Sequence, residues 1–186
     1  MTDDIRRDAE SRMSRALEAL ERDLAAIRTG RAATALVERI PVEYYGTSTP
    51  LNQLASISVP EAHSIVIQPW DRSALGAIEK AIQRSDVGLT PNVDGTAVRL
   101  NIPPLTEERR RDLVKIVHRR MEEARVEIRN HRRDVAEEVK KGEKDGSVTS
   151  DESRRELELL QKVTDRWTAE VDRVGKHKET EIMEVG

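Results

Sequence analysis

Four arginines lie close together on one face of a predicted helix: Arg125, Arg129, Arg132 and Arg133. Their i, i+4, i+7, i+8 spacing places them within an arc of about 100° on a helix of 3.6 residues per turn. Arginine presents a planar fork of N–H donors that matches the oxygens of a phosphate group. The spacing therefore predicts a surface that binds phosphate, and structured RNA is the ligand that it favours.

The charge of the rest of the chain makes this cluster unusual. The 186 residues carry a formal net charge of −3, yet residues 105–141 contain 12 basic and 9 acidic side chains, a balance of +3. Residues 1–30, 31–104 and 142–186 are each net acidic. Only this predicted helix thus carries a net positive charge.

The alternative interpretation is a solvated helix face with intrahelical salt bridges, on a helical scaffold or chaperone. Arg133 with Glu137, and Arg119 with Glu123, have the i,i+4 spacing that such pairs require. Against this alternative, the three arginines that precede Arg133 in the cluster have no acidic residue among them on the same arc.

The sequence contains no residue pattern that indicates catalysis. The absence of cysteine excludes disulfides and thiolate chemistry. His118 and Glu122 have i,i+4 spacing that could hold a metal on a helix face, but no third ligand accompanies them. Because the chain also shows no Ser-His-Asp order, phosphate-binding glycine loop or carboxylate pair, we expect no enzyme, no catalytic residue, no metal and no cofactor.

Aromatic residues make up only 2 % of the chain, and phenylalanine is absent. Tyr44 and Tyr45 are adjacent in a predicted strand, so we expect one in the core and one exposed. Trp70 and Trp167 are predicted to be packing residues. Such a composition is typical of long helices that bury Leu, Val, Ile and Ala along extended seams.

Three long helices are predicted from apolar residues at 3.6-residue spacing. The first covers about residues 3–29, where Gly30 can end it. The second runs from 107 to about 141 and is followed by a turn over 142–146. A capping box over 149–152 then begins a third helix that extends to about residue 184.

The segment between the first two helices has a different character. It contains all seven prolines of the chain and β-rich runs bounded by Pro, Gly or Asn. We expect strands at 41–46, 55–59, 64–68 and 97–102, and one short helix at 73–84.

These elements predict an α+β fold in two parts. Residues 1–30 and 105–186 form a long antiparallel three-helix bundle, and a small β-rich domain over 31–104 is inserted in it. Both connections lie at one end of the bundle, so we expect an L-shaped, hinged molecule. The expected hinge residues are Gly30, Pro103 and Pro104.

The N-terminus is acidic and lacks an apolar signal sequence, and no stretch approaches the roughly 18 apolar residues of a membrane span. We therefore expect a soluble, cytoplasmic protein with no membrane partner.

Several blocks of the sequence, in order over nearly its full length, closely resemble the bacterial ribosome recycling factor family. They are Ile27-Arg-Thr-Gly-Arg-Ala32, Val42-Glu-Tyr-Tyr-Gly46, Pro50-Leu-Asn-Gln-Leu-Ala-Ser56, Glu79-Lys-Ala-Ile82 with Ser85-Asp86, Pro103-Pro-Leu-Thr-Glu-Glu-Arg-Arg110 and Val126-Glu-Ile-Arg-Asn-His-Arg-Arg-Asp134.

The resemblance implies the same three-helix bundle with an inserted β-rich domain, in an outline similar to tRNA. It also implies a function in translation. A monomer would bind the post-termination ribosome and, with elongation factor G and GTP, split it into subunits. The bundle would lie against large-subunit ribosomal RNA, while the inserted domain would face the small subunit and be pushed by elongation factor G.

The resemblance also implies a set of RNA-contacting arginines: Arg28, Arg31, Arg110, Arg129, Arg132 and Arg133. One position departs from the family pattern, because the family often carries an aliphatic residue where this chain has His131. That departure concerns the packing of the bundle and not the binding of RNA.

Overall fold

The computed structural model describes residues 2–184, which form two compact units. One unit consists of residues 2–28 and 107–184, and the other of residues 29–106. Within the described residues, none of the helices has both the length and the apolar character needed to cross a membrane.

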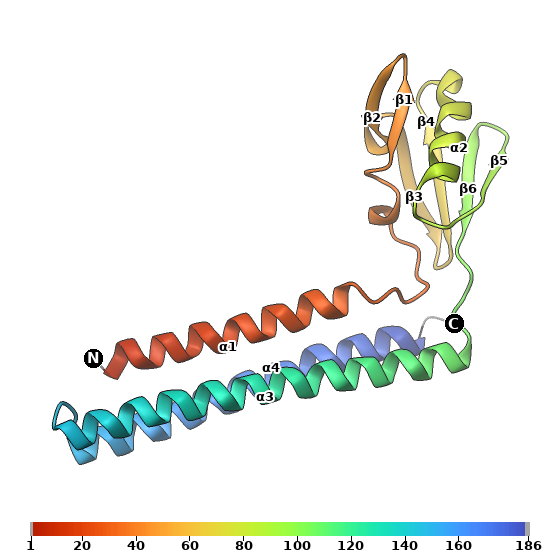
Figure 1. Cartoon of the computed structure of the whole chain (residues 1–186). Coiled ribbons are helices and arrows are strands. Elements are labelled where there is room, and N and C mark those ends of the chain that lie inside the picture. Colours follow the sequence, from red (N-terminus) through yellow and green to blue (C-terminus); the bar gives the residue numbers. More distant parts are fainter. Residues whose placement is uncertain (1, 185–186) are drawn as a thin grey trace. The chain divides into compact units, whose positions relative to one another are not determined.

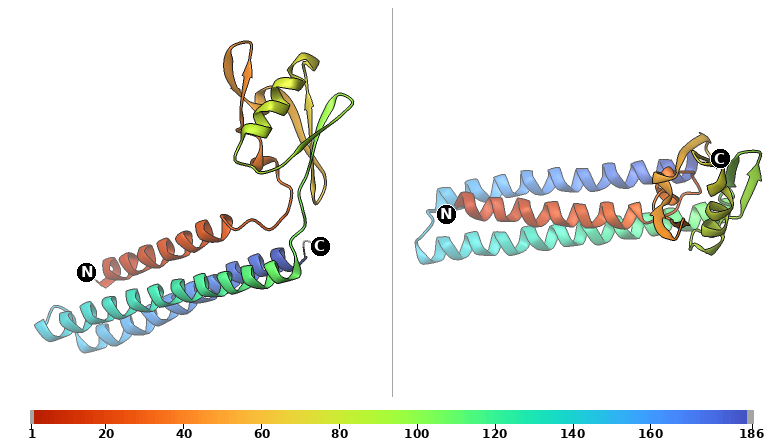
Figure 2. Two further views of the ribbon diagram at one scale, coloured as in Figure 1. Left: turned by 45° about the vertical axis from the view of Figure 1, so that its right-hand side comes forward. Right: turned by 90° about the horizontal axis from the view of Figure 1, so that it is seen from above.

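The first unit is a bundle of three helices, α1 (Thr2–Ala25), α3 (Glu107–Asp145) and α4 (Ser150–Glu184), which run side by side (Figure 1, Figure 2). Contacts between side chains give their directions. Arg6 and Glu10 of α1 pair with Glu156 and Arg166 of α4 in the same order along both helices, so α1 and α4 are parallel. The helix α3 is antiparallel to α4, because its contacts with α4 run in opposite order along the two helices.

The core of the bundle is made of small and aliphatic side chains, as the aromatic-poor composition predicts. The apolar residues that recur at 3.6-residue spacing along α3 are buried, and His131, which falls on the same seam, is half-buried with Nε2 3.5 Å from Glu127. The buried apolar residues of α1 and α3 are Ala9, Met13, Ala16, Leu17, Leu20, Leu24, Leu113, Val117, Met121, Ala124, Ile128, Val135 and Val139.

Two predicted helix ends are wrong. The helix α1 ends at Ala25, four residues early, because the β-branched Ile27 and Thr29 and then Gly30 are weak helix formers. The helix α3 continues past 141 to Asp145, since Gly142 packs against Val148 and it is Gly146, at φ +81°, that ends the helix.

The capping box that begins α4 is confirmed. The Glu152 amide donates to Thr149 Oγ1 at 3.2 Å, and the Thr149 amide donates to Glu152 Oε2 at 2.9 Å. These reciprocal bonds satisfy two backbone donors that a helix start would otherwise leave unpaired.

The second unit contains a four-stranded antiparallel sheet in the order β3-β4-β6-β5, a separate β1-β2 hairpin and the helix α2. A short 3₁₀ turn over 72–74 leads into α2. The bounds are β1 Pro41–Tyr44, β2 Thr47–Pro50, β3 Ala55–Glu61, β4 Ser64–Pro69, α2 Leu75–Arg84, β5 Pro91–Asp94 and β6 Ala97–Asn101.

The strands β2 and β5 are absent from the sequence-based expectation. Their sequences, TSTP and PNVD, are polar, and their residues are mostly exposed. They are strands because β1 and β6 supply backbone hydrogen-bond partners, which a polar local sequence does not reveal.

The β1-β2 hairpin ends in a two-residue turn, Tyr45-Gly46, where both residues have positive φ (48° and 77°). Tyr45 is 81 % exposed, while the half-buried Tyr44 donates a hydrogen bond to Asp71 at 2.6 Å. One tyrosine is therefore inside and one outside, as expected, but Tyr45 lies in the turn and not in a strand. The prediction that Trp70 is a packing residue is wrong, since it is 68 % exposed.

The turn between β3 and β4 holds both chain segments that lead out of this unit. The amide of Ala32 donates to the carbonyl of Ala62, and the amide of Ile102 donates to the carbonyl of His63. His63 Nδ1 also lies 2.9 Å from the carbonyl oxygen of Gly30. A Cβ at Gly30, where φ is +74°, would lie 3.2 Å from Leu105, so the two segments run close together here.

The helices α3 and α4 pack closely at Gly175, which is buried within α4. A Cβ at this position would clash with Sδ, Cε and Cγ of the buried Met121. A glycine in the middle of a helix is unfavourable by about 1 kcal/mol relative to alanine. The close packing against Met121 explains why α4 has a glycine here.

We expect Gly175→Ala to lower the free energy of unfolding. Overpacking costs about 1–3 kcal/mol, and most of that range exceeds the roughly 1 kcal/mol that alanine gains through helix propensity. Urea denaturation measures the change. Gly76→Ala in α2 is the control, because nothing lies within 4 Å of a Cβ there and stability should rise. If both substitutions stabilise the protein equally, the close contact with Met121 is not a constraint.

The hydrogen bond to Asp71 raises the pKa of Tyr44 to about 12. Since the folded-state pKa lies above the ordinary value of 10.0, this contribution to stability is complete below pH 10 and is lost as pH rises through 12. An absorbance titration of tyrosinate should contain a component near pH 12 that Asp71→Asn moves to lower pH. Tyr45→Phe should leave that component in place; if Asp71→Asn does so as well, the hydrogen bond does not form in solution.

Candidate nucleic-acid interface

A groove of about 370 Å³ on the surface of the bundle brings three of the predicted arginines together. Arg129, Arg132 and Arg133 line it from α3, with Leu157, Leu160 and Gln161 opposite them on α4. Because α3 is a straight, packed helix, the arginine backbones are fixed relative to one another. The groove therefore presents several guanidinium groups beside an apolar floor, an arrangement suited to a chain of phosphates.

Arg125, the first arginine of the cluster, has a structural role. It donates from Nε and Nη2 to Oδ1 of Asp172 on α4, at 3.2 and 2.5 Å, and from Nη1 to Glu122 at 3.2 Å. These bonds, led by the one to Asp172, raise the pKa of Arg125. Two carboxylates thus neutralise Arg125, which links α3 to α4 and does not line the groove.

Arg129 shares one of those carboxylates. Its Nη2 donates to Glu122 Oε1 at 2.6 Å, across two helical turns. Hydrogen bonds from Arg129 and then Arg125 hold the pKa of Glu122 below its ordinary value. No acid lies between Arg125 and Arg132 on the arc, yet two of these arginines are paired. Glu122, one turn before Arg125 on the same face of α3, accepts from Arg125 and Arg129, and Asp172 of α4 accepts from Arg125.

Within residues 2–184, no carboxylate forms an ion pair with Arg132 or Arg133. Arg132 donates from Nη1 to the amide oxygen of Gln161 at 3.0 Å, a neutral partner. Arg133 is exposed, and the predicted i,i+4 pair with Glu137 does not form. The positive charge of the groove is consequently concentrated at these two residues.

The other predicted arginines lie elsewhere. Arg28 and Arg31 are exposed and follow the end of α1, in different units of the structure. Arg110 is half-buried in the first turns of α3, where Nη1 donates to the carbonyl of Met183 at 3.1 Å. A rise of about 1.5 Å per residue separates Arg110 from Arg129 by roughly 28 Å along α3.

His118 and Glu122, which have the spacing of a metal-binding pair, contact different side chains. His118 Nε2 lies 3.2 Å from Glu179 of α4, and Glu122 receives the two arginines. Over residues 2–184, no three His, Asp or Glu side chains come together in a way that could hold a metal ion.

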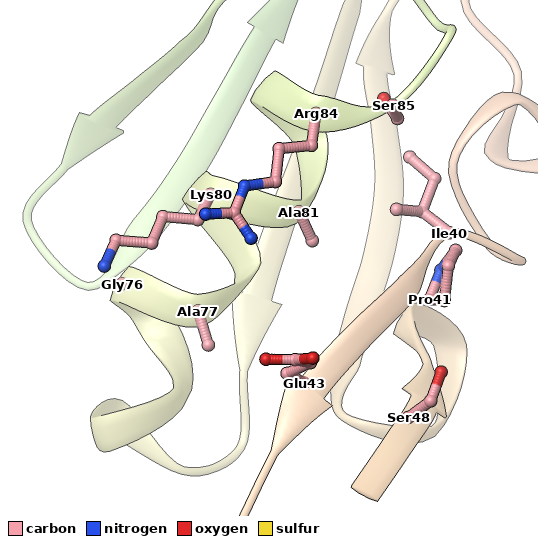
Figure 3. A pocket seen from close by; sticks show the side chains of 10 residues that line it. All are labelled: Ile40, Pro41, Glu43, Ser48, Gly76, Ala77, Lys80, Ala81, Arg84 and Ser85. Carbon is pink, nitrogen blue, oxygen red and sulfur yellow. The ribbon is translucent and has the colours of Figure 1, made fainter. Parts of the chain in front are cut away.

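A larger hollow of about 700 Å³ lies in the other unit, between β1 and α2 (Figure 3). Lys80 and Arg84 project from α2 on one side, and Glu43 projects from β1 on the other (Figure 3). Ala77 and Ala81 give it an apolar lining. With two cations opposed by one carboxylate, this hollow is less suited to consecutive phosphates than the groove of the bundle.

The sequence identified the arginines of the cluster but not their partners on α4. Asp172 and Gln161 are 47 and 29 residues away from the arginines that they hold. No local spacing relates them to α3, and only the register of two antiparallel helices brings them together.

Curated proteins that resemble this chain share its full length. The ribosome-recycling factor of Halalkalibacterium halodurans is 56 % identical over 185 residues, and that of Thermomicrobium roseum is 53 % identical over 185 residues. Each alignment covers 100 % of both chains.

Solved structures give the same result. The solution structure of a ribosome recycling factor matches with a TM-score of 0.71 and 48 % identity, over 99 % of this chain and 98 % of that one. The T. thermophilus ribosome recycling factor, placed with E. coli elongation factor G on the E. coli post-termination complex, matches over 100 % of both chains with a TM-score of 0.60 and 46 % identity.

The sequence model of one protein family, described as ribosome recycling factor, matches residues 20–183. That match includes all four arginines of the cluster and the whole of the β-rich unit. Together with the full-length relatives, it shows that the chain belongs to the ribosome recycling factor family.

Proposed function

We propose that this protein binds the post-termination ribosome and, with elongation factor G and GTP, promotes its dissociation into subunits. The single observation that carries the proposal is the full-length identity of 56 % to a ribosome-recycling factor. A related structure was placed with elongation factor G on a post-termination complex, which supports both partners. The protein is a translation factor of the cytoplasm that acts as a monomer and is not an enzyme.

The arginine groove of the bundle is the part that contacts large-subunit ribosomal RNA. Arg129, Arg132 and Arg133 are the central contacts, supported by their common groove and by the un-neutralised charge of the last two. Phosphate contacts of this kind position a protein on RNA without reading its sequence. Arg28, Arg31 and Arg110 are further contacts outside the groove.

The two segments that join the units form the hinge, with Gly30, Pro103 and Pro104 as its residues. Gly30 has a positive φ that favours glycine, and proline restricts the backbone of the other segment. The β3-β4 turn holds both segments through Ala32 and Ile102. Elongation factor G would push the β-rich unit about this hinge while RNA holds the bundle.

Subunit splitting, followed by light scattering, tests the proposal directly. Post-termination ribosomes should dissociate only when this protein, elongation factor G and GTP are all present. Arg132→Ala should weaken binding to purified large subunits by about an order of magnitude, because a charge-assisted phosphate contact is lost. Arg173→Ala, which removes an exposed arginine paired with Glu170 on the side of α4 next to α1, is the control and should bind normally. If the folded wild-type protein causes no splitting, the proposed function is wrong.

Arg125 and Arg133 should differ in what their loss affects. Arg125→Ala removes the link to Asp172 and should lower the free energy of unfolding by a few tenths to about 1 kcal/mol, with a small effect on RNA affinity. Arg133→Ala should leave stability unchanged and weaken affinity. Thermal unfolding and binding to large subunits measure the two effects. The reverse pattern would show that Arg125, and not Arg133, contacts phosphate.

A further inference from the structure

We infer that Gln161 and Asp165 of α4 are positioning residues, which hold the guanidinium of Arg132 in the groove without cancelling its charge. The inference rests on the proposed function, because it concerns how the groove binds phosphate. It assigns a role to two residues on the helix opposite the arginines.

The geometry is a chain of two hydrogen bonds. Arg132 Nη1 donates to Gln161 Oε1 at 3.0 Å, and Gln161 Nε2 donates to Asp165 Oδ1 at 2.8 Å. An amide group can rotate to present either its oxygen or its nitrogen to a neighbour. The carboxylate of Asp165 can only accept, so it selects the orientation in which the amide oxygen faces Arg132.

The chemistry of the acceptor is what distinguishes Arg132 from its neighbours. Arg125 and Arg129 are held by carboxylates, which order their side chains but also neutralise them. Gln161 orders Arg132 through a neutral oxygen and leaves its charge available. Among the interactions of residues 2–184, one donor of the guanidinium is used, and the remaining N–H groups can form a bidentate contact with a phosphate.

Ordering matters because fixing a mobile arginine side chain costs rotamer entropy. A guanidinium that folding has already placed loses less on binding RNA than a mobile one. Gln161 lines the groove itself, so Arg132 is held at the edge where a phosphate would lie.

Two substitutions at Asp165 isolate the positioning effect from charge. Asp165→Asn and Asp165→Ala change the net charge equally, but only asparagine keeps an oxygen that can accept from Gln161. We expect Asp165→Ala to bind purified large ribosomal subunits roughly two- to fivefold more weakly than Asp165→Asn, the factor expected for one hydrogen bond. Because alanine is the better helix former, weaker binding by Asp165→Ala cannot come from a less stable α4.

A substitution at Gln161 tests the need for a neutral acceptor. Gln161→Glu has nearly the same shape but places a carboxylate beside Arg132. Affinity should fall roughly three- to tenfold at low salt, and the slope of log K against log salt should become shallower by about 1, as for the loss of one phosphate contact. Gln83→Glu, an exposed position in α2 with the same change in charge, is the matched control and should change neither quantity.

The outcomes separate the inference from the function on which it rests. If the wild-type protein does not bind large subunits, the proposed function fails and the inference fails with it. If the wild-type protein binds, equal affinity of the two Asp165 variants, or a Gln161→Glu variant that behaves like Gln83→Glu, overturns the inference alone. Unchanged melting temperatures establish that a loss of affinity is not a loss of fold.

Discussion

The antiparallel register of α3 and α4 is the constraint on which the bundle and its charged surface depend. It is set in the core, where the absence of a side chain at Gly175 makes room for Met121. From that point, the contacts of His118 with Glu179 and of Arg125 with Asp172 follow on either side, about one helical turn away. A shift by one turn would separate these pairs. A packing contact between apolar atoms thus decides which arginines meet a carboxylate.

The arginines of α3 consequently divide into two kinds, although their spacing alone makes them look alike. Arg125 faces the junction of α3 with α4 and is neutralised by carboxylates from both helices. Arg132 and Arg133 lie further along the helix, where α4 offers the amide of Gln161 in place of an acid. The first kind stabilises the pair of helices, and the second leaves charge for a ligand. This division permits a basic groove on a protein whose formal net charge is −3.

Local physics explains which features the sequence could predict. The 3.6-residue seam of α3 and the Thr149–Glu152 capping box depend on residues within a few positions of one another, and both were predicted correctly. The strands β2 and β5 could not be predicted, because their polar sequences become strands only through neighbours that supply hydrogen bonds. The α4 partners of the arginines depend on the register between helices, which no spacing within one helix contains.

The surface of α3 also shows why a helical bundle suits the contact with RNA that we propose. A phosphate chain has fixed spacing, so arginines that bind it gain affinity when their backbones are already fixed. The buried residues of α3 fix the backbone of the helix, and the hydrogen bond from Arg132 to Gln161 also orders the Arg132 side chain. Arg133 is exposed and has no such partner among residues 2–184. One guanidinium held by a neutral partner and one without such a partner in the same groove can fit a rigid RNA surface and still accommodate small differences in its geometry, which matches contacts that position without reading sequence.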